Sequence, residues 1–234
     1  MCYDGAKDFI TGGIMSTKKS ENTRRKILDT AQRLFSERGY DNVTMKDIAR
    51  ELSITHANLY YYFNNKIDLA GVLFDEGVDV LISFIQKCRT RTEDKFLLVV
   101  LFSLLFSERL LKDEAFQTVF LDVYNYADFD QDSLAHSRNT RFYILMEMAE
   151  EAGIEDIEDF MNFKILMTDA FMKTIFKAMK NQLLYRDLDQ ITDSYFELFV
   201  LEDFHISRES YLKTKAEAKK WMPEIKEFEK NATT

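Results

Sequence analysis

Proline and glycine are scarce in this sequence. Among 234 residues there is one proline, Pro223, and there are seven glycines. These residues supply the usual punctuation of sheets and tight turns, so their scarcity favours a mostly helical protein. Hydrophobic residues make up 46% of the chain, which is ample for a packed core and argues against disorder.

Cysteine and histidine are rare as well. Cys2 and Cys88 give neither a disulfide framework nor the paired spacing of a metal site, and they suit a reducing cytoplasm. The histidines, His56, His136 and His205, lie far apart, without acidic or cysteine partners at ligand spacing. We therefore expect no metal, no cofactor and a cytoplasmic location.

No hydrophobic run is long enough to cross a membrane. The most apolar stretch, residues 96–106, has 11 residues and is bounded by charged residues, so we expect a buried central helix. Residues 1–14 lack the basic start and apolar run of a secretory signal. They are either a disordered extension or a misplaced start, and Met15 is the more natural beginning.

Basic residues are outnumbered by acidic residues overall but are concentrated in one segment. The net charge is −9, which argues against a general nucleic-acid coat or a basic membrane-surface protein. Residues 16–66 nevertheless hold ten Lys or Arg and six Asp or Glu, a charge of +4, while the remainder carries −13. This segregation indicates a nucleic-acid-binding segment near the N-terminus.

Three short helices are predicted within the basic segment. Apolar residues recur at three- and four-residue spacing over residues 23–38, and Gly39 follows as a stop. Thr44 can cap a second helix, with Asp47 at the spacing of a capping box, and Thr55 can cap a third. Two helices joined by such a short turn are typical of a helix-turn-helix.

The residues of this segment resemble the DNA-binding signature of the TetR family over about residues 23–70. The stretches that carry the resemblance, in the family's order and spacing, are Ile27-Leu28-Asp29-Thr30-Ala31, Leu34-Phe35, Gly39-Tyr40, Val43-Thr44-Met45-Lys46-Asp47-Ile48-Ala49, Leu59-Tyr60-Tyr61-Tyr62-Phe63 and Lys66-Ile67-Asp68-Leu69. Ser53 stands in the turn where the family often has Gly, and Ala57-Asn58 stand where Gly and Thr are frequent. We expect these departures to affect the operator sequence rather than the fold.

The resemblance implies an all-α fold with two domains. We expect a three-helix helix-turn-helix DNA-binding domain at residues 16–66 and a helical ligand-binding and dimerisation domain at 67–234, after a disordered extension at 1–15. The later helical pattern continues without repeats. Helices are expected at about 66–88, 94–109, 112–126, 133–152, 156–184, 189–205 and 208–229.

The head is expected to bind double-stranded DNA. Basic side chains of the N-terminal arm and first helix can neutralise phosphates, and by the resemblance Thr44 and Lys66 grip phosphates on either side of the groove. The third helix would enter the major groove, where Asn58 is the best candidate for a paired contact to adenine. The expected DNA-binding residues are Lys18, Lys19, Arg24, Thr44, Met45, Thr55, His56, Asn58, Tyr60, Tyr61 and Lys66.

By the same resemblance, the last long helices pair with a second copy of the chain. The resulting homodimer would place two recognition helices one DNA turn apart on a palindromic operator. The expected interface residues are Phe160, Phe163, Met167, Phe171, Tyr195 and Phe199.

The body is rich in aromatic residues and methionine, with 20 Phe, 11 Tyr and 10 Met. This composition is common in ordinary cores and also suits a pocket for a hydrophobic or aromatic effector. The expected pocket residues are Phe102, Phe106, Tyr124, Phe142, Met146 and Phe171. Effector binding would move the helix that begins at Lys66 and release a repressor from DNA.

The sequence bears on two other classes of function. An enzyme is not expected, because the sequence has no Ser/His/Asp set, phosphate-binding glycine loop or close carboxylate pair. A DNA-binding protein of TetR fold with a structural or non-ligand-gated role stays open. One or two binding sites beside a promoter would favour the repressor, and many scattered sites the structural role.

Overall fold

The computed structural model describes residues 18–122 and 142–232, and every regular element in these ranges is an α-helix. The expected all-α class is confirmed. The chain divides into two compact units, the first ending at Leu69 and the second beginning at Ala70. This division lies three residues beyond the boundary expected after residue 66. No helix within the described ranges is both long and apolar enough to cross a membrane.

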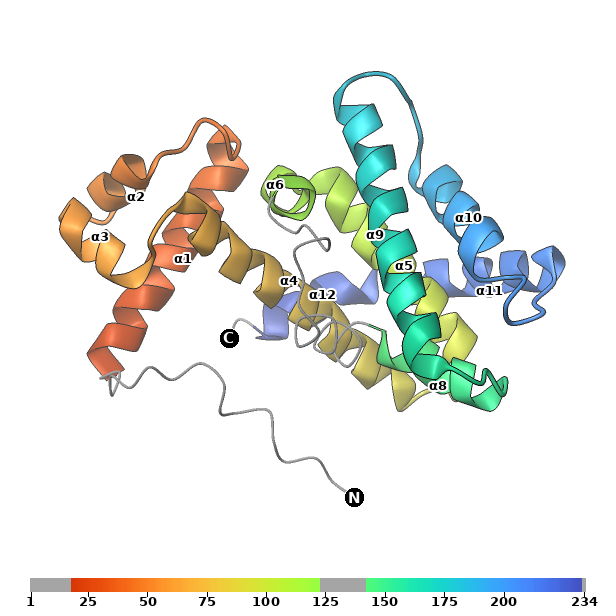
Figure 1. Ribbon diagram of the computed structural model, residues 1–234. Helices are drawn as coiled ribbons and strands as arrows, with labels where there is room; N and C mark the ends of the chain where they lie inside the picture. The colour runs from red at the N-terminus through yellow and green to blue at the C-terminus, as the bar shows by residue number, and fades with distance from the viewer. Residues whose placement is uncertain (1–17, 123–141, 233–234) are drawn as a thin grey trace. The chain divides into compact units, whose positions relative to one another are not determined.

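The first unit consists of three helices in the expected order. They are α1 (Lys18–Arg38), α2 (Met45–Glu51) and α3 (His56–Tyr62) (Figure 1). Their common core includes Ile27, Leu34, Ile48 and Leu59, all fully buried. Helix α1 ends at the predicted stop because Gly39 adopts a φ of 81°, in the left-handed region that glycine enters without steric cost.

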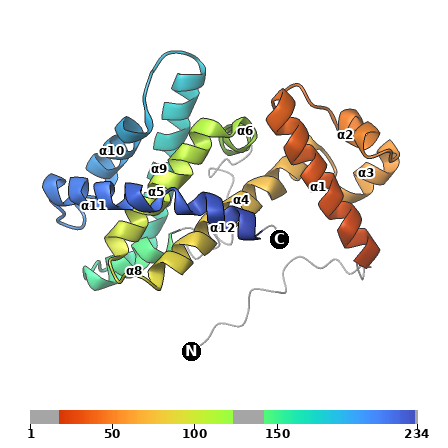
Figure 2. The ribbon, with the colours of Figure 1, turned by 180° about the vertical axis from the view of Figure 1, so that it is seen from behind.

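The second unit is built from the helices that follow. They are α4 (Lys66–Arg89), which begins in the first unit, α5 (Lys95–Lys112), α6 (Glu114–Asp122), α8 (Tyr143–Glu151), α9 (Ile157–Lys180), α10 (Leu188–Phe199), α11 (Arg208–Trp221) and α12 (Glu224–Ala232). Helix α5 runs through the middle, packed against α6, α8, α10 and α11 (Figures 1 and 2). The prediction of a buried central helix at residues 96–106 is confirmed, and Leu101 and Leu104 are fully buried.

Several helix bounds differ from those expected. The helix expected at 208–229 is divided into α11 and α12, because Pro223 has no backbone N–H to continue α11. The helix expected at 189–205 ends at Phe199, and the chain then turns through His205, which has a φ of 51°. The first helix begins at Lys18 rather than residue 23. Of the helix expected at 133–152, the described residues contain α8.

Helices α10 and α11 are joined by a polar cluster. The buried Tyr211 hydroxyl donates to Asp193 Oδ1 at 2.7 Å, and Lys215 Nζ lies 2.5 Å from the same oxygen. Lys215 and Lys219 also approach Asp189, at 2.9 and 2.6 Å. The hydrogen bond from Lys219 is the largest cause of a lowered pKa at Asp189. The cluster fixes α11 over α10 through charge-assisted bonds.

Candidate DNA-binding surface and ligand cavity

Side-chain caps define the segment from α2 to α3. Thr44 Oγ1 accepts the N–H of Asp47, and the Asp47 carboxylate accepts the N–H of Thr44, which confirms the predicted capping box. Thr55 accepts the N–H of Asn58 at the start of α3. Between the helices, Ser53 adopts a φ of 53°. The turn therefore uses a conformation that favours glycine, although serine occupies it.

Helix α3 has one buried and one exposed face. Leu59 is buried in the head's core, whereas His56 and Asn58 are exposed, and Tyr60 and Tyr61 expose 42% and 65% of their surface. The rings of His56 and Tyr60 meet edge to face with centroids 4.7 Å apart. The exposed face therefore offers an imidazole, an amide and two phenol groups, which can reach base edges and phosphates.

Two residues expected to contact DNA point into the head instead. Lys66 Nζ donates to the carbonyl oxygens of Tyr40 and Val43, at 2.9 and 3.0 Å, and lies 3.9 Å from the centre of the Tyr40 ring. Burial lowers the pKa of Lys66. This lysine ties the start of α4 to the loop between α1 and α2. Met45 is buried, because its apolar side chain completes the core.

Of the remaining predicted DNA-binding residues, those with described side chains lie on the surface of the head. Arg24 is exposed, with its guanidinium 5.1 Å from the centre of the Phe63 ring. Thr44 is exposed, but its hydroxyl is engaged in the capping box. Lys18 and Lys19 form the first turn of α1, and their side chains lie outside the described part of the chain.

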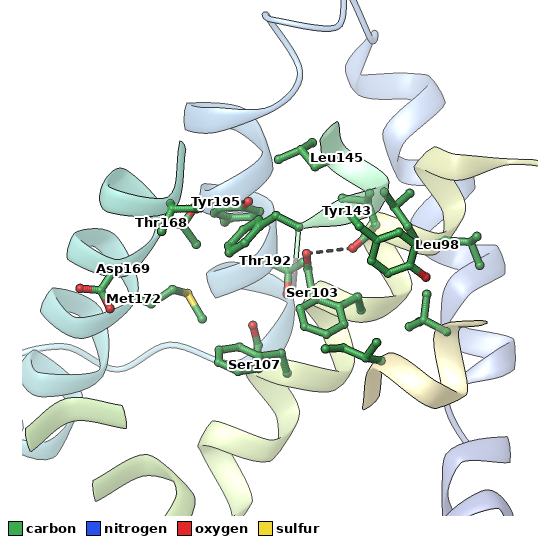
Figure 3. Close-up of a pocket in the computed structure, with 18 of the residues that line it drawn as sticks. Leu98, Ser103, Ser107, Tyr143, Leu145, Thr168, Asp169, Met172, Thr192 and Tyr195 are labelled. Atoms are coloured by element: carbon green, nitrogen blue, oxygen red, sulfur yellow. Dashed lines mark hydrogen bonds between the residues drawn. The ribbon is translucent and has the colours of Figure 1, made fainter. Parts of the chain in front are cut away.

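A cavity lies in the second unit, lined by residues of α4, α5, α6, α8, α9 and α10 (Figure 3). Three of the predicted pocket residues, Phe102, Phe106 and Phe142, line it. Met146 and Phe171 are not among its described lining residues. Phe171, on α9, instead packs against the aromatic rings of Tyr195 and Phe199 on α10. Tyr124 lies outside the described residues. The aromatic wall is therefore supplied mainly by α5 and the start of α8.

Hydroxyl groups interrupt the apolar lining of the cavity. Ser103 and Thr192 donate to carbonyl oxygens one turn earlier in their own helices, at 2.9 and 2.7 Å. Thr168 and Tyr195 are bonded to each other, with their oxygens 3.4 Å apart. The sequence prediction missed these residues. A signal was available in and directly after the most apolar run, where Ser103 and Ser107 are four residues apart and so lie on one helix face.

Helices α9 and α10 carry exposed apolar side chains. Phe163 and Leu166 of α9 expose 53% and 42%, and Leu198 of α10 exposes 66%. The predicted interface residues that are partly buried are Phe160, Met167, Phe171 and Phe199. Tyr195 is buried and lines the cavity, which corrects its expected place on the surface. Leu166 and Leu198 were not among the expected interface residues, because several faces of these helices are apolar in sequence.

The order and geometry of α1 to α3 define a helix-turn-helix DNA-binding head. Residues 27–72 match the model of the family described as bacterial regulatory proteins, tetR family. The biofilm operon icaADBC negative transcriptional regulator IcaR of Staphylococcus epidermidis is 24% identical over 178 residues, 74% of this chain and 95% of that protein. An HTH-type transcriptional regulator of Staphylococcus aureus is 32% identical over 72 residues, 31% of this chain and 39% of that protein.

Solved structures share the fold of most of the chain. RolR in complex with resorcinol has a TM-score of 0.59 at 19% identity, covering 81% of this chain and 95% of that one. A transcriptional regulator from Saccharomonospora viridis in complex with choline has a TM-score of 0.51 at 20% identity, covering 78% and 96%. The protein is thus a helical DNA-binding regulator. Its head, residues 27–72, matches the TetR family, as the sequence resemblance predicted.

The described residues contain no group of three or more His, Cys, Asp or Glu that could hold a metal ion. The relatives are named as transcriptional regulators rather than enzymes.

Proposed function

We propose that this chain is a homodimeric repressor that binds a palindromic operator through α3 and releases it when a small molecule occupies the cavity. The observation that carries the proposal is the exposed face of α3, which presents hydrogen-bonding side chains on a helix-turn-helix of the TetR family. The name of IcaR as a negative regulator supports repression over activation.

The proposed base contacts lie on α3. The amide of Asn58 can donate and accept at once, which matches the major-groove edge of adenine. Tyr60 and Tyr61 can donate to phosphates on either side of the groove. Lys46, which is exposed beside Thr44 at the start of α2, joins the proposed phosphate contacts, whereas two of the three donors of Lys66 are used inside the head.

The proposed dimer buries the exposed apolar side chains of α9 and α10. Phe163, Leu166 and Leu198 are large hydrophobic groups that water solvates poorly. A two-fold interface lets the same surface serve both subunits and requires an operator with matching symmetry. Half-sites are then expected about 34–36 Å apart, one turn of B-DNA.

The proposed effector site is the cavity of the second unit. RolR and the Saccharomonospora viridis regulator, which share the fold, were solved with resorcinol and choline, and this supports a small-molecule ligand here. Helix α4 begins in the first unit and contributes Ile82 and Ile85 to the cavity lining. A ligand that favours one position of α4 would change DNA affinity by its differential binding to the two states.

DNA binding is tested by fluorescence anisotropy with the protein's own upstream DNA in a salt series. The double variant Asn58→Ala/Tyr60→Ala should bind specific DNA at least about tenfold more weakly, since each good base contact contributes about 1–3 kcal/mol. Gln32→Ala, which changes an exposed residue of α1, should bind normally. Equal binding of specific and unrelated DNA by the wild type would refute the proposal. Binding of the protein at many scattered sites in the genome would favour the structural role.

A further inference from the structure

The hydroxyl groups of Thr168 on α9 and Tyr195 on α10 lie side by side in the wall of the cavity (Figure 3). Their oxygens are 3.4 Å apart, and Tyr195 is buried. A hydroxyl placed in this way is removed from bulk water. It therefore gains from any partner that the cavity brings to it.

The Thr168–Tyr195 pair has one hydroxyl donor left over. The wall also carries the hydroxyls of Ser107 and Tyr143, and the described residues provide no hydrogen-bond partner for the buried Tyr143 oxygen. The hydroxyl hydrogens of Ser103 and Thr192 are used on the carbonyl oxygens of Val99 and Leu188. Thr168 and Tyr195 together have two hydroxyl hydrogens but form one bond between them, and the described residues provide no second acceptor for the pair. One O–H group is thus available to an acceptor inside the cavity.

The wall carries little usable charge. Asp169 is the one charged residue among the described lining residues, and it is buried with Lys173 Nζ 3.1 Å from its carboxylate. An anion in the cavity would meet no Lys, Arg or His among the lining residues that the structure describes. A cation would have to compete with Lys173 for the carboxylate. Since burying an uncompensated charge is costly, the cavity favours a neutral ligand.

The size and shape of the cavity limit the ligand further. Its volume is about 90 Å³. A single water needs about 10–15 Å³ on this measure, so there is room for roughly six to nine non-hydrogen atoms. The rings of Phe102, Phe106 and Phe142 line this space and favour contact with a flat apolar body.

We propose that the cavity selects a small uncharged molecule with a single apolar ring and an oxygen that accepts a hydrogen bond, and that the Thr168–Tyr195 hydroxyl pair is its specificity-determining contact. The regulatory meaning of this selection rests on the proposed function. The binding itself can be measured without DNA.

The test uses the full chain and calorimetric titration with phenol and toluene, which have nearly the same size and shape. Phenol should bind about two- to twelvefold more tightly than toluene, the range of one net hydrogen bond. Benzoate and choline, as the anionic and cationic probes, should bind more weakly than phenol. Equal affinities for phenol and toluene, tighter binding of either charged probe, or no binding of any probe would overturn the inference.

Matched variants assign the effect to the hydroxyl pair. Thr168→Val and Tyr195→Phe should each remove most of the preference for phenol while toluene binding is kept. Thr192→Val makes the same Thr-to-Val change at a hydroxyl already bonded to its own helix, and it should keep the preference. Thermal unfolding verifies that each variant is folded. A preference that survives Tyr195→Phe and Thr168→Val would exclude the pair as the contact.

The DNA assay is run separately, so the two proposals fail separately. Specific DNA binding without any probe binding contradicts the ligand inference alone. Selective phenol binding without specific DNA binding contradicts the proposed function alone.

Discussion

Ser53 occupies the turn between α2 and α3 with a φ of 53°. An L residue pays about 1–2 kcal/mol in the left-handed region, and glycine avoids this cost but loses more backbone entropy on folding. We expect Ser53→Gly to raise the free energy of unfolding by about 0.5–1 kcal/mol. Urea denaturation measures this change in the free energy of unfolding. Ser36→Gly, the same change on the exposed face of α1, should lower stability, and two changes of the same sign would contradict the strain at Ser53.

Asp189 links stability to acid pH. Its pKa lies below the ordinary value of 3.8, first because Lys219 donates to it and further because Lys215 does. A lowered folded-state pKa means that the stabilisation is present above pH 3.8 and is lost as the pH falls through the lowered value. Asp189→Asn should therefore lower the Tm at pH 7, with a smaller deficit near pH 2–3.

Scanning calorimetry at the two pH values gives this comparison. Glu155→Gln removes one carboxylate from the exposed turn before α9 and controls for the change in net charge. A deficit for Asp189→Asn that is equal at both pH values would exclude the linkage.

Some residue roles in the head depend on neighbours in the sequence, and others depend on residues far away in the sequence. The caps at Thr44 and Thr55 were predictable, because a cap depends on residues three positions away. The inward bonding of Lys66 was not, since its acceptors are carbonyl groups 23 and 26 residues earlier. From the sequence alone, a lysine at the start of a helix is as compatible with a phosphate contact as with bonding inside the head. The three-dimensional position of those carbonyls decides the outcome.

At the scale of elements, α4 contains two glycines with different surroundings. A Cβ at Gly71 would meet no described atom within 4 Å, whereas a Cβ at Gly77 would lie 3.1 Å from the Arg109 guanidinium and 3.2 Å from Phe116. Arg109 is held there by bonds to the Gly77 carbonyl and to Glu229. The two positions should therefore respond oppositely to the same substitution.

Gly71→Ala should raise the free energy of unfolding by about 0.8–1 kcal/mol, the difference in helix propensity. Gly77→Ala should lower it by about 1 kcal/mol, because the crowding of a packed site outweighs that gain. Chemical denaturation of both variants measures the contrast. Stabilisation by Gly77→Ala would mean that Arg109 moves aside at little cost.

Helix existence was largely predictable, and the cavity was only partly so. The apolar spacing within each helix predicted nearly all the described elements, and Pro223 was available as a signal for the break that was missed. The cavity depends on how helices distant in sequence meet. Tyr195, for example, faces inward beside Thr168, 27 residues earlier, and periodicity on an apolar helix cannot select between two apolar faces.

At the scale of the whole molecule, the proposed dimer makes the strongest prediction. Leu166→Glu places a charge on the exposed apolar surface of α9 and should halve the molar mass measured by light scattering. It should also weaken operator binding, because a dimer binds two half-sites at once whereas a monomer binds only one. Leu212→Glu makes the same change at an exposed leucine of α11 and should stay dimeric. A wild type that is monomeric at micromolar concentration would refute the dimer.

The central place of α5 has a consequence for how the chain is made. Its apolar faces are covered in part by α11, which ends about 110 residues after α5. At synthesis rates of about 5–20 residues per second, α5 leaves the ribosome roughly 5–20 s before that cover exists. The head has no such delay, since its core is formed by residues that are close in sequence. A nascent chain is therefore expected to carry a folded head and an uncovered α5, the segment at which a chaperone would bind.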